Sequence, residues 1–236
     1  MSHQPSFLRR YVYPRFPGLE RWARRVKAKA DSAKPEREYA EFGLDTFLIE
    51  QLTPEVTKGQ IYVEVGGNHP INMSNTYRLY RHGMRGYIIE PNATLVELHR
   101  MIRPGDSAVQ CGCGAEAGIV EFVHLPDHEN SYIRSAGQQI PPDARIEVLP
   151  IVKVDEILKN NTQPIFFMSV DTEGYDIEVL RGATETLKRT TYLCVEMSSD
   201  GAVADEEALK ELLSGGFEVE KTFGNNRVYR RRMTSS

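Results

Sequence analysis

The chain has 236 residues, of which 40% are hydrophobic and 26% charged, and its net charge is −4. A chain of this size and composition can bury a sizeable core as one large domain with an appendage. No apolar run approaches the ~18 residues that a membrane span needs, and the N-terminus lacks the apolar core of a secretory signal. We therefore expect a cytoplasmic protein without a membrane-spanning helix.

The cysteines are few and odd in number: Cys111, Cys113 and Cys194. Cys111 and Cys113 offer two metal ligands without a second pair. The pattern therefore favours reduced structural thiols over a zinc site or a disulfide.

The charge is unevenly distributed along the chain. Residues 1–37 contain ten basic and three acidic residues, a net charge of +7, which leaves −11 for the remainder. Several apolar residues of this arm fall on one helical face: Leu19, Trp22, Ala23, Val26 and Ala30. The pattern predicts a basic amphipathic helix over residues 18–33. A Lys-Pro pair then marks the boundary between an arm, residues 1–35, and a domain, residues 36–236.

Such a helix could lie on an anionic membrane surface as a peripheral contact. The alternative, which we favour, is that its apolar stripe packs on the domain while its basic face is solvated. Nucleic acid is a poor candidate partner, because the basic residues are confined to this arm and to residues 227–232, without an aromatic-lined groove motif. The sequence leaves the oligomeric state open.

A strand, loop, helix and strand form the central predicted unit. A helix over residues 36–52, with Phe42, Phe47, Leu48 and Leu52 as core residues, is expected to precede it. The β-branched and aromatic run 61–65 predicts a strand buried on both faces, and Gly66-Gly67 allows a tight turn. A helix over residues 72–81, with Met73, Tyr77 and Tyr80 at helical spacing, then leads through Gly83 to a strand over residues 87–89.

The glycine loop of this unit favours one kind of ligand over another. A dinucleotide site needs a third glycine for close helix packing, and that glycine is absent here. Glu64, near the end of the first strand, would repel a pyrophosphate but attract a ligand with an amine or a sulfonium, such as S-adenosylmethionine. Glu90, at the end of the second strand, lies 24 residues after Gly66, near the roughly 20-residue offset at which an acid binds ribose hydroxyls.

The middle of the chain predicts a helix carrying Leu95, Val96 and Leu98 and strands over residues 107–111 and 118–125. The small residues 111–114 could lie against an adenine, or they could be an ordinary exit from the strand. Residues 126–144 read as a long loop of the kind that often closes over a site. Polar side chains on or beside it could touch an acceptor: His124, His128, Asn130, Ser131 and Tyr132.

Two acids follow a second buried strand, residues 165–170, which is preceded by a strand at 145–152 and a helix at 154–158. Because ligands bind at the carboxyl ends of parallel strands, we expect Asp171 and Glu173 beside the loop of Glu64. Carboxylates there can accept a proton from a hydroxyl or hold a divalent ion. The alternative is that one of them caps the next helix, whose inward residues are Ile177, Val179, Leu180 and Leu187.

The C-terminal part predicts a strand over residues 191–196, ending in Glu196, a helix over 205–213, and strands over 217–222 and 227–231. The last two strands are close enough to form an antiparallel hairpin, with Asn225-Asn226 in its turn. The expected fold is therefore α/β: a Rossmann-like class I methyltransferase fold, with a mostly parallel seven-stranded sheet, a C-terminal antiparallel hairpin and flanking helices.

Three segments resemble the FkbM-type methyltransferases: residues 63–76, residues 86–92, and residues 169–183, of the form D-x-E-G-x-[DE]-x-x-V-L-x-G. The family implies O-methylation dependent on S-adenosylmethionine, often of sugar hydroxyls on glycans, glycolipids or secondary metabolites. By this resemblance Asp171 and Glu173 face the transferred methyl group and the acceptor. The family often has alanine where this chain has Gly67, a mild departure.

The resemblance and the strand-end pattern together give one candidate cofactor site: Glu64, Gly66, Gly67, Asn68, Ser74, Asn75, Glu90, Pro91, Asn92, Cys111 and Gly112. A divalent metal is conceivable beside the two acids, but no motif supports one. Two other functions stay open, a nicotinamide-dependent sugar oxidoreductase and a non-catalytic nucleoside-binding protein. The missing third glycine and the closing hairpin argue against the oxidoreductase.

Overall fold

The computed structural model describes residues 17–125, 131–134, 137–197 and 203–232. The chain divides into two compact units, Met1–Arg37 and Glu38–Ser236. The first unit contains helix α1, Pro17–Ser32, close to the predicted bounds. Its end is tied by Lys34, whose Nζ lies 2.6 Å from the Asp31 carboxylate.

The second unit is built on a seven-stranded sheet of order β10-β11-β9-β8-β1-β2-β3. Five strands, β9, β8, β1, β2 and β3, run parallel to one another. Strand β11 is antiparallel to both β9 and β10. Their bounds are β1 Ile61–Val65, β2 Gly86–Ile89, β3 Ser107–Val109, β8 Ile165–Val170, β9 Thr190–Glu196, β10 Phe217–Phe223 and β11 Asn226–Arg231. This topology confirms the predicted fold class.

The C-terminal hairpin turns one residue earlier than predicted. Phe223 pairs with Asn226, so Gly224 and Asn225 form the turn, and Gly224 has a φ of 57°. Asn226 is already in β11, where it also pairs with Glu196 of β9. A glycine at the left-handed position explains why the turn forms there.

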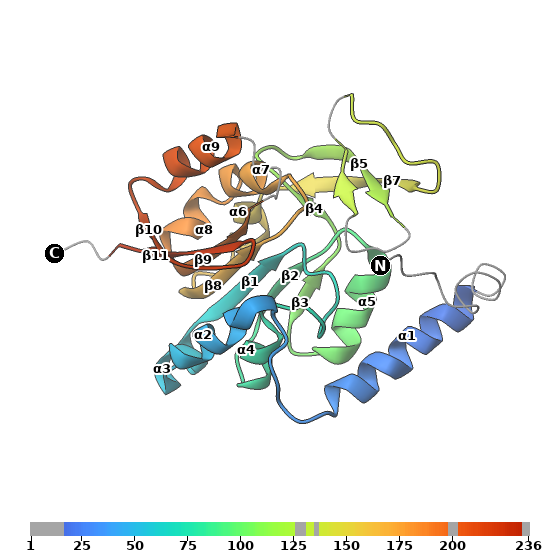
Figure 1. Ribbon diagram of the computed structural model, residues 1–236, viewed down its shortest axis with the longest axis horizontal. Coiled ribbons are helices and arrows are strands. Elements are labelled where there is room, and N and C mark those ends of the chain that lie inside the picture. The colour runs from blue at the N-terminus through green and yellow to red at the C-terminus, as the bar shows by residue number, and fades with distance from the viewer. Residues whose placement is uncertain (1–16, 126–130, 135–136, 198–202, 233–236) are drawn as a thin grey trace. The chain divides into compact units, whose positions relative to one another are not determined.

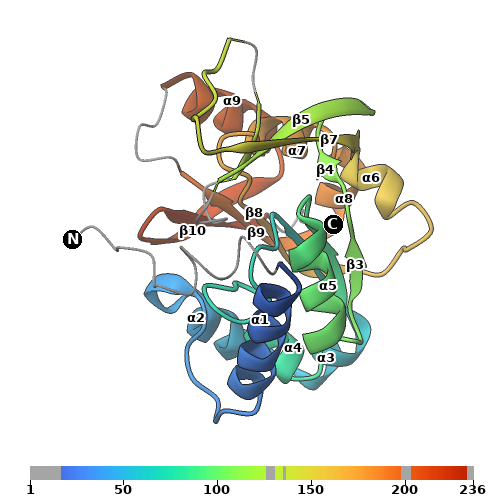
Figure 2. The same ribbon diagram turned by 90° about the vertical axis from the view of Figure 1, so that its right-hand side faces the viewer.

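Helices cover both faces of this sheet (Figures 1 and 2). On one face Leu44, Leu48 and Leu79 pack with Tyr62 and Phe167. The helices of that face are α2, Leu44–Glu50, and α4, Tyr77–Arg81. The opposite face packs against α6, Val154–Ile157, α7, Asp176–Arg181, α8, Thr184–Lys188, and α9, Val203–Leu213, while α5, Ala93–Ile102, lies along β2 and β3.

A second, four-stranded sheet of order β4-β7-β5-β6 was not anticipated. Its strands are β4 Gly112–Cys113, β5 Gly118–His124, β6 Tyr132–Ile133 and β7 Arg145–Val152. The two long strands match the predicted ranges, but they pair with each other instead of extending the main sheet. The predicted loop after residue 125 therefore contains β6, which pairs with β5.

Two predicted helices begin later than expected. The first is interrupted because Phe42 and Gly43 have φ values of 55° and 78°, which leaves a 3-10 turn, η2, at Glu41–Gly43 before α2. Phe42 is 65% exposed, so its assignment to the core was wrong. The second helix, predicted from residue 72, begins at Tyr77, because the preceding residues wrap around buried polar groups.

One helix was missed altogether: α3, Pro54–Gly59. Thr53 caps its N-terminus, because the Thr53 Oγ1 accepts a hydrogen bond from the Val56 amide. A threonine before a proline is a standard helix start. No helix in the described part of the chain is both long enough and apolar enough to span a membrane.

Candidate active site

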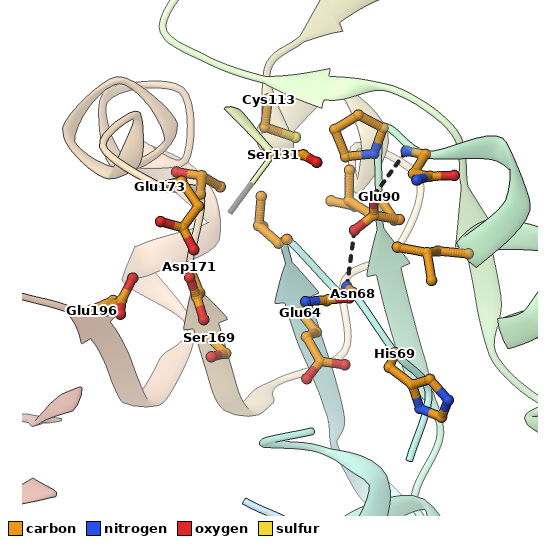
Figure 3. Close-up of a pocket in the computed structure, with 18 of the residues that line it drawn as sticks. Glu64, Asn68, His69, Glu90, Cys113, Ser131, Ser169, Asp171, Glu173 and Glu196 are labelled. Atoms are coloured by element: carbon orange, nitrogen blue, oxygen red, sulfur yellow. Dashed lines mark hydrogen bonds between the residues drawn. The ribbon is translucent and has the colours of Figure 1, made fainter. Parts of the chain in front are cut away.

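The carboxyl ends of β1, β2, β8 and β9 open into a cavity of about 290 Å³, which the second sheet helps to enclose. Figure 3 shows Glu90 on one side of this cavity and the Asp171 and Glu173 side chains on the other. The sequence-predicted site residues that line it are Glu64, Gly66, Gly67, Asn68, Asn75, Glu90, Pro91, Asn92, Cys111, Gly112, Asp171 and Glu173. Ser74 is buried behind the wall and does not line the cavity.

The glycine loop brings two strand ends into contact. Gly66 has a φ of 80°, and a Cβ atom there would overlap the carbonyl oxygen of Asp171. The Asp171 amide in turn donates to the Val65 carbonyl at 3.0 Å. Gly67 is also tight, because a Cβ would overlap the Ile88 side chain. Alanine at position 67 would therefore require Ile88 to move in this chain.

Glu90 is held by two backbone amides. Its carboxylate accepts hydrogen bonds from Asn68 N at 2.9 Å and from Asn92 N at 2.8 Å, one on each oxygen (Figure 3). Burial raises the pKa of Glu90 from 4.5 to about 7, against the lowering effect of these two amides. The carboxylate keeps further acceptor capacity, which suits a ligand that carries hydroxyl groups.

Glu64 is balanced by a buried arginine that sequence reasoning missed. Its carboxylate accepts hydrogen bonds from Thr76 Oγ1 at 2.6 Å and Ser74 Oγ at 3.3 Å, and Arg103 Nη1 lies 3.4 Å away. Arg103 is fully buried and also donates to the Pro70 carbonyl and to Thr76. Glu64 lines the cavity, but its carboxylate is already engaged by these side chains and holds residues 70–76 in place. Its charge is therefore less available to a ligand than the sequence suggested.

His99 of α5 holds the loop from the other side. Its Nε2 lies 3.1 Å from the Gly67 carbonyl oxygen and 2.9 Å from that of Asn68. Burial, followed by the charge of Arg103, lowers the pKa of His99 to about 3. A neutral imidazole that donates from Nε2 to both carbonyls satisfies this geometry. Asn75 fixes the end of the same loop, because its Nδ2 donates to Ser169 Oγ of β8 at 3.0 Å.

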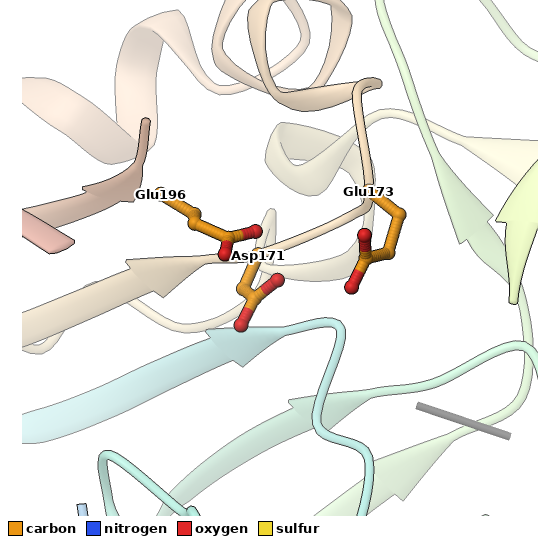
Figure 4. A group of neighbouring side chains, drawn as sticks. All are labelled: Asp171, Glu173 and Glu196. Atoms are coloured by element: carbon orange, nitrogen blue, oxygen red, sulfur yellow. The ribbon is translucent and has the colours of Figure 1, made fainter. Parts of the chain in front are cut away.

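Three carboxylates converge at the ends of β8 and β9 (Figure 4). Single oxygens of Asp171, Glu173 and Glu196 all lie within 4.8 Å of one another. Glu196, noted in the sequence only as an acid at a strand end, lines the cavity with the two predicted acids. Such a group can share a proton or, if a divalent ion is present, supply oxygen ligands.

The environment of Asp171 favours its protonated form. Burial first, and then the negative charges of Glu196 and Asp176, raise the pKa of Asp171 well above its usual range. Neither predicted acid caps the next helix, since α7 begins at Asp176 without a side-chain cap from either of them. Asp176 itself accepts a hydrogen bond from the Thr172 amide at 3.1 Å and stabilises this turn.

The second sheet supplies an apolar wall opposite the strand ends. Phe122 and Ile133 line the cavity with Cys111 and Gly112, and Ser131 adds a hydroxyl group. The three cysteines of the chain are buried and free. His124 pairs instead with Glu147 at 2.8 Å and is absent from the described lining, as is Tyr132. His128 and Asn130 lie outside the described residues.

The fold is Rossmann-like, and the cavity lies at the carboxyl ends of its parallel strands, where such sheets bind their ligands. The FkbM methyltransferase domain matches residues 64–219, which is most of the chain. The protein therefore belongs to the FkbM methyltransferase family, as the sequence resemblance predicted. A comparison with curated proteins finds no match.

Several solved structures are similar to this chain at low sequence identity. A candidate O-methyltransferase from Klebsiella pneumoniae is 11% identical with a TM-score of 0.46, covering 97% of each chain. A TehB-like SAM-dependent methyltransferase from Corynebacterium glutamicum is 10% identical with a TM-score of 0.45, covering 92% of this chain and 99% of that one. Aeropyrum pernix fibrillarin, with bound S-adenosyl-L-methionine, is 9% identical with a TM-score of 0.41, covering 79% and 71%.

Proposed function

We propose that the protein transfers a methyl group from S-adenosylmethionine to a hydroxyl oxygen of a sugar in a glycan or glycolipid, or of a related secondary metabolite. The observation that carries this proposal is one cavity that joins the amide-held Glu90 to the carboxylates Asp171, Glu173 and Glu196. The first feature suits a nucleoside, and the second suits removal of a proton from a hydroxyl group.

The donor set fits the cofactor. Glu90 is placed at the end of β2 with acceptor capacity for ribose hydroxyls, and the loop of residues 66–68 is held open by His99 and by the left-handed Gly66. Cys111 and Gly112 leave a small-residue surface for the flat ring, and Asn75 lies at the opposite end of the loop. When bound, the cofactor supplies a sulfonium-activated methyl group, which is electrophilic without metal or acid activation.

The task left to the protein is alignment and proton removal. We assign the base to Asp171, with Glu173 orienting the acceptor and Glu196 sharing the proton that Asp171 receives. Because Asp171 lies beside two other carboxylates, its ionised form is a strong base, and it accepts the hydroxyl proton from that form. Transfer would break the sulfur–methyl bond, form an oxygen–methyl bond and leave S-adenosylhomocysteine, while the hydroxyl proton passes to the carboxylates and then to solvent.

The first test is a calorimetric titration with S-adenosylhomocysteine, followed by transfer of radiolabelled methyl groups into cell-envelope fractions. We expect Asp171→Asn to lower transfer by at least about 100-fold while binding of S-adenosylhomocysteine changes much less. The exposed Asp143→Asn is the matched control and should behave as the natural chain.

Two outcomes would contradict the proposal. Tight binding of NAD without binding of S-adenosylhomocysteine would favour the oxidoreductase. Binding of S-adenosylhomocysteine without transfer to any acceptor fraction would favour a non-catalytic nucleoside-binding protein. An unchanged rate in Asp171→Asn would remove Asp171 from the mechanism while leaving methyl transfer intact.

A further inference from the structure

Helix α1 presents an exposed apolar stripe. Trp22 is 61% exposed and Val26 is 50% exposed, and Ala30 is exposed as well. These residues are four apart, so they lie in a row on one helical face. A tryptophan in water exposes a large apolar area. Burying this row in an apolar environment would therefore be favourable in free energy.

Basic side chains accompany the stripe. Lys27 and Lys29 are exposed on the same helix, and the whole arm of residues 1–37 has a net charge of +7. The helix has 16 residues, and no described helix qualifies as a membrane span. Apolar residues on one face and lysines around it are the features of a helix that lies in the plane of a membrane interface.

We propose that α1 binds the surface of an anionic lipid bilayer, with Trp22 and Val26 inserted at the level of the headgroups and the lysines on the phosphates. Tryptophan favours this depth because its ring is apolar while its N–H group can donate to polar headgroups. The proposal is independent of methyl transfer, although it would place the enzyme where glycolipid acceptors are found.

Charge and stripe together favour a bilayer over other partners. Binding to nucleic acid would satisfy the lysines but leave the apolar row in water. A second copy of the arm would bring two segments of charge +7 together, which is repulsive at moderate salt. Anionic lipid satisfies both features at once.

Trp22 makes a direct experiment possible, because it is the only tryptophan among the 236 residues. The full-length protein is mixed with vesicles of phosphatidylcholine alone or with added phosphatidylglycerol, and tryptophan emission is recorded. We expect a shift of the emission to shorter wavelength with the anionic vesicles, little change with neutral ones, and reversal when salt is raised.

Matched variants distinguish the contribution of the lysines to vesicle binding from that of the apolar stripe, and binding is measured by vesicle sedimentation. Lys27→Gln with Lys29→Gln should weaken binding about 25-fold, since each basic residue near the surface contributes about fivefold. The control, Lys188→Gln with Lys210→Gln, removes the same charge from exposed positions on α8 and α9 and should bind as the natural chain. Val26→Asp should also weaken binding, with the lysines intact.

Several results would overturn the proposal. Emission already at short wavelength without vesicles, and unchanged by them, would show that the protein itself covers the stripe. Concentration-dependent emission in the absence of lipid would identify a second copy as the partner. Equal weakening by the control pair would show a general charge effect, and competition by RNA with no lipid response would identify a nucleic-acid site.

Discussion

Glu64 and Asp171 lie at the ends of neighbouring strands of one sheet, yet their surroundings are opposite. Glu64 has a buried arginine within 3.4 Å and two hydroxyl donors. Asp171 faces Glu173 and Glu196, and no salt bridge to Asp171 is present among the described residues. A balanced acid is suited to holding structure, whereas an acid among like charges is suited to taking a proton.

Glu90 is a third case in the same cavity. Its carboxylate is held by two backbone amides and by no cation in the described part of the chain. Amides orient the carboxylate without neutralising its charge, so its protonation responds to burial and to a ligand. The three acids therefore predict three different responses to mutation and pH.

Replacement of Arg103, the cation beside Glu64, should have the largest effect on stability. Arg103→Met would leave Glu64 buried without its partner, and we expect a loss of about 3–5 kcal/mol in the free energy of unfolding. Urea denaturation followed by circular dichroism measures this loss. The control is Arg100→Met in the last turn of α5, three residues before Arg103; Arg100 is exposed, and its replacement should change the free energy of unfolding by no more than about 0.5 kcal/mol.

A second mutation sharpens this result. If Glu64 is the reason for the loss, Arg103→Met combined with Glu64→Gln should recover part of it, because the uncompensated charge is gone. Equal or larger destabilisation in the double variant would show that Arg103 acts through its other partners and not through Glu64. Those partners are the Pro70 carbonyl, the hydroxyl groups of Ser74 and Thr76, and the Asp106 carboxylate at 3.8 Å.

The arginine also shows where sequence reasoning stopped. The buried strands and their acids were predictable, because apolar runs with Glu64, Glu90 and Asp171 at or next to their carboxyl ends follow from local pattern. Arg103 and His99 were not, since basic residues at the end of a helix are usually solvated and favoured there by the helix dipole. Their burial depends on the fold of a loop some 30 residues away along the chain.

The second sheet was unpredictable for a related reason. Strands at 118–125 and 145–152 were expected, but the local sequence does not determine which strand each of them pairs with. Pairing of β5 with β7 and with β6 brings Phe122 and Ile133 over the cavity. The small residues at 111–114 were proposed as a ring-binding surface without knowledge of this opposing wall.

Glu90 should give the next largest effect, seen in the pH dependence of cofactor binding. Its pKa is raised to about 7 by burial, and ribose hydroxyls donate to the ionised form. Binding of S-adenosylhomocysteine should therefore weaken about tenfold from pH 8 to pH 6, as the carboxylate gains a proton. Titration in buffers of different ionisation enthalpy should show proton release on binding near pH 7.

The variant Glu90→Gln tests the assignment. It should bind S-adenosylhomocysteine more weakly at all pH values, because its NH₂ group would face one of the two amides that now donate to the carboxylate. It should also lose the pH dependence of binding, because a glutamine side chain does not ionise. Retention of the full pH dependence in this variant would assign the titration to another group.

Replacement of Asp171 should change stability least, and it should stabilise the protein, whereas replacement of Arg103 destabilises it. Since the folded-state pKa of Asp171 is raised, the folded protein binds a proton that the unfolded chain has already lost, and this group lowers stability as pH rises above the unfolded pKa. Asp171→Asn should therefore stabilise the protein at pH 8 by roughly 1 kcal/mol, and this gain should vanish at acid pH, where both states are protonated. Thermal unfolding across the pH range measures it, with Asp143→Asn as the exposed control. A loss of stability at pH 8 would mean that the Asp171 carboxylate is held by a cation, as Glu64 is, and that the two strand ends do not differ in the way the carboxylate cluster indicates.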